Sequence, residues 1–126
     1  GIAVNDMENA NKLFSALLGV PNYKMETVES EKVSTSFFKV GESKVELLKA
    51  TDPESPIAKF IAKKGEGIHH VAFEVDDIHS MITELRSQGF QLLSDEPKKG
   101  ADNKLICFLH PKSTNGVLVE LCQEIR

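Results

Sequence analysis

The chain has 126 residues, of which 40% are hydrophobic and 27% charged, and its net charge at pH 7 is −4. These values are typical of one globular domain that buries a core without disulfide bonds. The negative charge argues against nucleic-acid binding, and no apolar run approaches the roughly 20 residues of a transmembrane helix. We therefore expect a single soluble domain over residues 1–126, located in the cytoplasm, or in an organelle matrix if the source is eukaryotic.

The first half predicts a short strand, one helix and three further strands. An apolar run at residues 2–4 precedes Asn5 and Asp6, either of which can cap a helix. Apolar residues then recur at spacings of three and four up to Gly19, which is a typical helix end. They are Met7, Ala10, Leu13, Phe14, Leu17 and Leu18. We expect strands at residues 22–30, 32–40 and 43–49.

Residues 50–66 are interpreted as a connector with a short helix, because Ser55-Pro56 is an N-cap followed by proline at the first helical position. Beyond the connector the pattern restarts. A strand is expected at residues 71–75, a helix from Asp77 to Gly89, and strands at residues 90–94, 104–110 and 117–122.

The two halves resemble each other in sequence. Residues 4–7 (VNDM) match residues 75–78 (VDDI), and residues 45–47 (VEL) match residues 119–121 (VEL). Strand, helix and carboxylate recur in the same order, which indicates an internal duplication. We predict an α+β fold of two tandem βαβββ modules forming a curled mixed sheet, with repeat 1 at about 1–49, the connector at about 50–66 and repeat 2 at about 67–126.

The duplication places two carboxylates, Glu46 and Glu120, at equivalent points inside apolar strands. A buried carboxylate must be hydrogen-bonded, protonated or bound to a cation. Strand alternation places His70 on the same face as these side chains, and imidazole with carboxylate suits a divalent first-row metal. Glu46, His70 and Glu120 are therefore the candidate metal ligands. The repeat also predicts a further histidine at the second position before Gly1.

The remaining histidines and both cysteines have simpler interpretations. His69 points away from the candidate site and is expected to be structural or to support a ligand, while His79 lies on the polar side of a helix. His110 ends a strand before Pro111, where it could border the pocket, and is not a candidate ligand. Cys107 and Cys122 sit in apolar strands, and we expect two reduced core thiols rather than a disulfide.

Residues 67–78 (GIHHVAFEVDDI), with residues 55–60, 110–113 and 116–121, resemble methylmalonyl-CoA epimerases of the vicinal oxygen chelate (glyoxalase/bleomycin resistance/dioxygenase) superfamily. The resemblance covers essentially the whole chain. It implies a homodimer, a metal site between paired modules, and an acyl-CoA substrate. The family's metal positions fall on Glu46, His70, Glu120 and the expected upstream histidine. A second acid proposed for one epimerase falls on Thr35, so that role does not carry over.

The activity implied is epimerisation of (R)- and (S)-methylmalonyl-CoA. The hydrogen between the thioester and the carboxylate is weakly acidic, and a divalent ion (Co, Mn, Ni, Zn or Mg) would stabilise the enediolate. Glu120 is the first candidate for the base and Glu46 for the opposite acid or base. Lys112 and Ser113 are the candidate substrate-binding residues. Lys98, Lys99 and Lys104 belong to the same lysine-rich stretch, which either meets the phosphates of CoA or is a solvated loop.

Three alternatives remain open at this point. Glyoxalase I, a lactoylglutathione lyase, shares the scaffold and the metal chemistry. An extradiol-type oxygenase would need iron with two histidines and one carboxylate, so the extra carboxylate counts against it. A non-catalytic module that binds a small ligand would not need Glu46, His70 and Glu120, and metal content would distinguish it.

Overall fold

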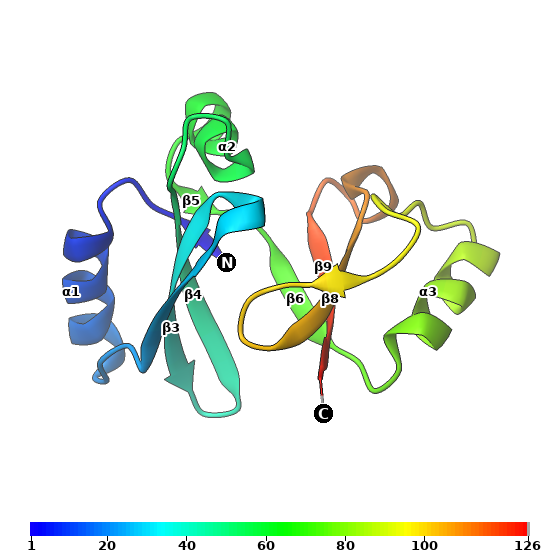
Figure 1. Ribbon diagram of the computed structural model, residues 1–126, viewed down its shortest axis with the longest axis horizontal. Helices are drawn as coiled ribbons and strands as arrows, with labels where there is room; N and C mark the ends of the chain where they lie inside the picture. The colour runs from blue at the N-terminus through cyan, green and yellow to red at the C-terminus, as the bar shows by residue number, and fades with distance from the viewer. Residues whose placement is uncertain (126) are drawn as a thin grey trace. The chain divides into compact units, whose positions relative to one another are not determined.

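The computed structural model describes residues 1–125 and divides the chain into two compact units, Gly1–His69 (unit 1) and His70–Arg126 (unit 2). Each unit contains one mixed sheet with a long helix against it (Figure 1). No helix within residues 1–125 has both the length and the apolar character needed to cross a bilayer.

Unit 1 contains a five-stranded sheet in the order β2-β3-β4-β1-β5. Its strands are β1 (Ile2–Ala3), β2 (Lys24–Val28), β3 (Val33–Val40), β4 (Ser43–Ala50) and β5 (Gly67–Ile68). β1 runs parallel to β4, and all other neighbours are antiparallel. The helices are α1 (Met7–Leu18), α2 (Pro56–Lys64) and the 3-10 helix η1 (Glu29–Glu31).

Helix α1 begins and ends as its sequence predicts. The Asp6 carboxylate accepts the backbone N–H of Asn9 at 3.1 Å, and Gly19 closes the helix in the left-handed region at φ 74°. The apolar side of α1 packs on one face of the sheet in a core cluster formed by Val4, Met7, Ala10, Phe38 and Leu47.

Helix α2 covers part of the opposite sheet face. Ser55 is fully buried, and its Oγ accepts the N–H of Ile57 at 3.2 Å, which fixes the start of the helix. Ile57 then packs with Ala3 and Leu48 in a separate cluster. Unit 1 therefore buries apolar side chains on both faces of its sheet.

Unit 2 repeats the strand–helix–three-strand order. Its sheet has the order β6-β9-β8-β7, with β6 parallel to β9. The elements are β6 (Val71–Glu74), α3 (Ile78–Ser87), β7 (Lys98–Lys99), β8 (Lys104–Leu109), the 3-10 helix η2 (Pro111–Ser113) and β9 (Val119–Glu124). Helix α3 packs on this sheet through a cluster formed by Ile78, Ile82, Leu85, Cys107, Leu109 and Leu121.

The shared order β1-α1-β2-β3-β4 and β6-α3-β7-β8-β9 confirms the two predicted βαβββ modules and the α+β class. Each module has its own curled, open mixed sheet. Cys107 and Cys122 are both buried and form no disulfide, also as predicted.

Three strand predictions are wrong in detail, and one of them is the strand expected at residues 117–122, which spans Val119–Glu124. Residues 90–94 form only an isolated bridge, Leu92 to Leu109, and the short strand β7 takes the edge position instead. Around this bridge the Leu93 N–H donates to the Phe108 carbonyl at 2.9 Å and the Gln91 carbonyl accepts the His110 N–H at 2.8 Å. Beyond it, the carbonyl of Ser94 accepts from Arg86 Nη2 at 3.1 Å instead of from a neighbouring strand. The strand predicted to reach residue 30 ends at Val28, where η1 begins.

Candidate active site

Glu120 lies in β9, the second strand of the unit 2 sheet. Its register partners are Ala72 in β6 and Phe108 in β8. Directly opposed residues point to the same face of a sheet. The apolar neighbours of Glu120 in β9, Val119 and Leu121, belong to the cluster under α3. Glu120 therefore projects from the face opposite that helix.

His70 meets Glu120 on this face, as strand alternation predicts. His70 Nε2 is 3.9 Å from Glu120 Oε1, and the two side chains are only 7% and 15% exposed. The ring of His70 also stands edge-on to Phe108, with 5.7 Å between ring centres and 90° between planes. Unit 2 thus brings together an imidazole and a carboxylate, both largely removed from water, and a half-buried aromatic ring.

Glu46 occupies the equivalent place in unit 1. It lies in β4 opposite Phe37 of β3, and the next residue, Leu47, is fully buried in the α1 core. Within each unit, taken over residues 1–125, no three His, Cys, Asp or Glu side chains gather closely enough to hold a metal ion. The unit 2 site therefore supplies a pair of candidate ligands, and the assignment of Glu46 as a third stays a prediction.

The chemistry of the pair suits a divalent ion. Imidazole nitrogen and carboxylate oxygen bind such ions at about 2.0–2.2 Å, so two donors on one ion are separated by at most about 4.2 Å. The 3.9 Å between His70 Nε2 and Glu120 Oε1 is longer than a good hydrogen bond and falls within that limit. The two donors therefore fit a metal of the kind that the residue types predict.

Lys112 and Ser113 lie in η2, between β8 and β9. The backbone N–H of Lys112 donates to His110 Nδ1 at 3.0 Å, and its side chain is exposed. The Oγ of Ser113 accepts the N–H of Gln91 at 2.9 Å. The segment is therefore held by its own hydrogen bonds, and the sequence prediction that both residues bind substrate stays a prediction.

Lys104 was grouped by sequence with a lysine-rich stretch that either meets the phosphates of CoA or is a solvated loop. In the structure it is paired with carboxylates instead. Its Nζ is 3.8 Å from Glu74 and 3.9 Å from Glu124, and its side chain is 14% exposed. Two carboxylates therefore neutralise this lysine, which makes it a poor partner for a phosphate.

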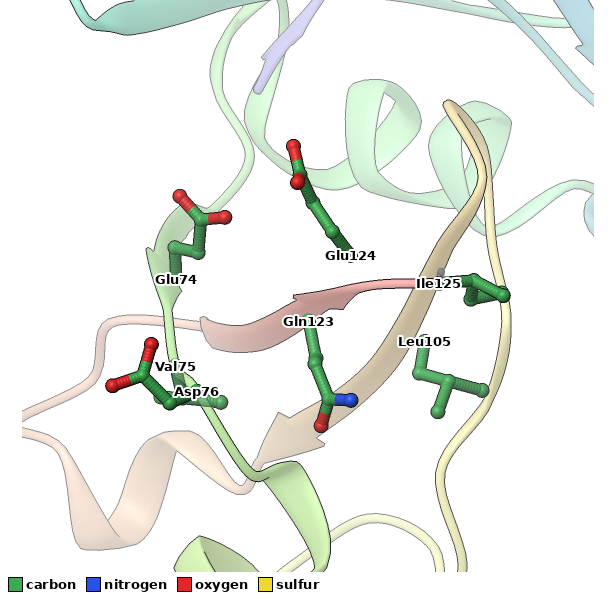
Figure 2. Close-up of a pocket in the computed structure, with 7 residues that line it drawn as sticks. All are labelled: Glu74, Val75, Asp76, Leu105, Gln123, Glu124 and Ile125. Atoms are coloured by element: carbon green, nitrogen blue, oxygen red, sulfur yellow. The ribbon is translucent and has the colours of Figure 1, made fainter.

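A hollow of about 450 Å³ opens at the end of the unit 2 sheet (Figure 2). It is lined by Glu74, Val75, Asp76, Leu105, Gln123, Glu124 and Ile125. Three of these side chains are carboxylates, so the hollow would repel a polyanion such as CoA. Gln123 also has a structural role there, since its Oε1 accepts the N–H of Ile78 at 2.7 Å. The acidic hollow is not a candidate substrate site.

His69 is structural, as predicted. Its ring stands edge-on to Phe60 of α2 with 5.0 Å between ring centres, and its N–H donates to the carbonyl of Gly1 at 2.7 Å. Burial lowers the pKa of the His69 imidazole, and the positive amino terminus lowers it further. His79, by contrast, is exposed on α3, as expected.

The lowered pKa of His69 predicts a pH dependence of stability. Between that pKa and the ordinary value of about 6.5, the unfolded chain binds a proton that the folded chain does not. The contribution of His69 to the free energy of unfolding is therefore fully present above about pH 6.5, and it is lost as the pH falls toward the lowered pKa. In thermal melts between pH 7.5 and pH 5, His69→Gln should lose less stability on acidification than wild type. His79→Gln should follow wild type, and equal slopes for His69→Gln and wild type would refute the role of burial.

The chain matches a known superfamily over most of its length. Residues 1–108 fit the sequence profile of the Glyoxalase/Bleomycin resistance protein/Dioxygenase superfamily, and the chain belongs to it. The resemblance drawn from residues 67–78 is thereby confirmed at the level of the superfamily.

Within the superfamily, the chain is similar to methylmalonyl-CoA epimerases. It is 41% identical over 123 residues to the mitochondrial methylmalonyl-CoA epimerase of Mus musculus, covering 97% of this chain and 69% of the relative. It is 40% identical over 124 residues to the ethylmalonyl-CoA/methylmalonyl-CoA epimerase of Cereibacter sphaeroides, covering 97% and 92%. A variant of the Streptomyces coelicolor methylmalonyl-CoA epimerase, solved in complex with 2-nitronate-propionyl-CoA, superposes with a TM-score of 0.95 at 32% identity, covering 100% and 94%.

Proposed function

We propose that this chain is an enzyme that interconverts the two C2 epimers of methylmalonyl-CoA. The observation that carries the proposal is the sheltered His70–Glu120 pair, found in a chain that aligns with epimerases over 97% of its length. A base shielded from water, beside a group that can help hold a cation, is what removal of a weakly acidic C–H proton needs.

Glu120 is the proposed base on one side of C2. Its carboxylate takes the C2 proton, and the electron pair of the C–H bond moves into the bond to the thioester carbon, leaving negative charge on the thioester oxygen. Collapse of that charge returns the pair to C2, which then takes a proton from the other side. Glu46, the repeat equivalent of Glu120, is the proposed acid or base there.

Glu46, His70 and Glu120 are also the proposed ligands of a divalent cofactor ion, with Co, Mn, Ni, Zn and Mg as candidates. When bound, such an ion supplies Lewis-acid stabilisation of the charge that develops on oxygen. The edge-on contact with Phe108 holds the ring of His70 in place, so that Nε2 stays directed at Glu120. A rigid ligand of this kind loses little conformational entropy on binding.

Lys112 and Ser113 complete the proposal as residues that bind the acyl-CoA substrate. The exposed Lys112 ammonium can meet a phosphate or carboxylate, and the hydrogen bonds of η2 fix its backbone. We further propose a homodimer. Leu13 and Leu17 of α1 are 53% and 70% exposed, and apolar side chains this open are suitable for a contact between subunits.

Proton exchange at C2 tests the proposed function. In deuterated water, the metal-loaded protein should exchange the C2 hydrogen of methylmalonyl-CoA for deuterium. The exchange is monitored by NMR as the loss of the C2 hydrogen signal. The same preparation should leave the hemithioacetal of methylglyoxal and glutathione unchanged. Turnover of the hemithioacetal without C2 exchange would instead identify a glyoxalase I, and absence of both activities in metal-loaded protein would favour a binding module.

A further inference from the structure

Each of the two candidate carboxylates has a phenylalanine directly opposite it in the neighbouring strand. Phe37 faces Glu46 in unit 1, and Phe108 faces Glu120 in unit 2. Side chains opposed in this way have Cβ atoms about 4.5–5.5 Å apart and share one face of the sheet. The duplicated fold therefore sets an aromatic ring beside each glutamate.

The two phenylalanines differ in their surroundings. Phe37 is fully buried, with Tyr23 packed at 5.9 Å between ring centres and Lys24 Nζ over the ring at 5.1 Å. Phe108 is only half-buried, and its ring makes the edge-on contact with His70. Of this pair, only Phe108 keeps open surface on the face that carries a candidate base.

We propose that Phe108 determines which alkyl group at C2 the enzyme accepts. This rests on the proposed function. For Glu120 to reach the C2 proton, C2 and its alkyl substituent must lie on the sheet face that carries Glu120. Phe108, directly opposite Glu120 in the neighbouring strand, lies on that same face. An aromatic face favours an alkyl group through burial and dispersion, and its bulk limits the size of that group. Phe108 is then the wall against which the methyl group of the substrate packs.

The chemistry of the substituent sets the size of the effect. Methyl and ethyl differ by one methylene, which a hydrophobic pocket discriminates by roughly 10–200-fold. Leucine at position 108 would remove part of the wall and leave room for that methylene. Tryptophan would extend the wall and exclude it.

The experiment measures kcat/KM for C2 proton exchange with methylmalonyl-CoA and with ethylmalonyl-CoA, in wild type, Phe108→Leu and Phe108→Trp. We expect the ratio of ethyl to methyl to rise about 10-fold or more in Phe108→Leu and to fall in Phe108→Trp. Phe73→Leu is the matched control, because Phe73 is 56% exposed on β6 and alternation turns it away from the face of Ala72. It should keep the wild-type ratio.

The ratio of the two kcat/KM values separates a specificity role from a structural one. A variant that only loses stability or metal loses activity toward both substrates by the same factor, so its ratio does not change. Metal content and circular dichroism are recorded for every variant, because Phe108 touches His70. Ratios within twofold of wild type in both Phe108 variants would overturn the proposal. If one variant does not fold, the other decides. Failure of the proposed function would appear separately, as absence of exchange in wild type.

Discussion

Glu120→Gln is expected to lower kcat for C2 proton exchange by at least about 10³-fold, within the 10²–10⁴-fold range of general acid–base catalysis. Glutamine has the shape of glutamate and retains an oxygen that can bind a cation, but it cannot accept the proton. Because Glu120 is 15% exposed beside His70, no bulk water replaces it readily as base. The expected signature is a loss in kcat with little change in KM, measured by NMR in deuterated water.

Glu124→Gln is the matched control for this substitution. Glu124 lies in the same strand, four residues along and on the same face, but its side chain is 55% exposed and pairs with Lys104 at 3.9 Å. Its replacement should leave the exchange rate within about twofold of wild type, because its carboxylate is half exposed and pairs with Lys104 rather than with His70. Substantial activity in Glu120→Gln, or an equal loss in Glu124→Gln, would remove Glu120 from the role of base.

His70→Ala is expected to abolish retention of the metal and, with it, C2 exchange. Loss of a hydrogen bond behind a metal ligand typically costs 10–100-fold in affinity, so loss of the ligand itself should cost more than about 100-fold. Metal content after dialysis and the exchange rate are the two measurements. His79→Ala, on the exposed side of α3, should match wild type in both.

His70→Phe separates ligation from packing. A phenyl ring can retain the edge-on contact with Phe108 while removing the nitrogen that lies 3.9 Å from Glu120. We expect it to lose metal as His70→Ala does while melting closer to wild type. Full metal occupancy in His70→Phe would contradict the assignment of His70 as a ligand.

The helices and the duplication could be predicted because their signals are local. Asp6, Ser55 and Asp77 cap the three helices through side-chain oxygens that accept backbone N–H groups, and these residue types are the usual N-caps. The spacing of apolar residues then indicates the face of each helix that packs on the sheet, although Leu13 and Leu17 of α1 are 53% and 70% exposed. Two copies of the same strand–helix–strand order give the class of fold without knowledge of any long-range contact.

The errors come from interactions between residues distant in sequence or from side chains that compete with the sheet. The strand expected at residues 90–94 is reduced to a bridge between Leu92 and Leu109, and beyond it Arg86 takes the carbonyl of Ser94. The pairing of β5 with β1 depends on two residues that have no strand pattern of their own. The neutralisation of Lys104 required the register that brings Glu124 opposite it.

The candidate site could be predicted in part. Alternation along the strand correctly placed His70 on the face of Glu120, because side-chain direction in a strand has a period of two. The aromatic partners Phe37 and Phe108 were missed, although both occupy equivalent positions of the repeat. Both phenylalanines are visible in the sequence, but only the pairing register shows that each one lies opposite a candidate glutamate. The roles of Glu46, Lys112 and Ser113, and the upstream histidine, stay predictions.

The measurement that tests the central claim most directly starts from a single C2 epimer of methylmalonyl-CoA in deuterated water. Configuration and deuterium content at C2 are then followed together. Glu120 and Glu46 are proposed to remove and return a proton on opposite sides of C2. This predicts approach to an equal mixture of epimers, with deuterium in the epimer that is formed. Deuterium incorporation with full retention of configuration would show that one group serves one side only, and a substrate that keeps both its configuration and its hydrogen would refute the proposed function.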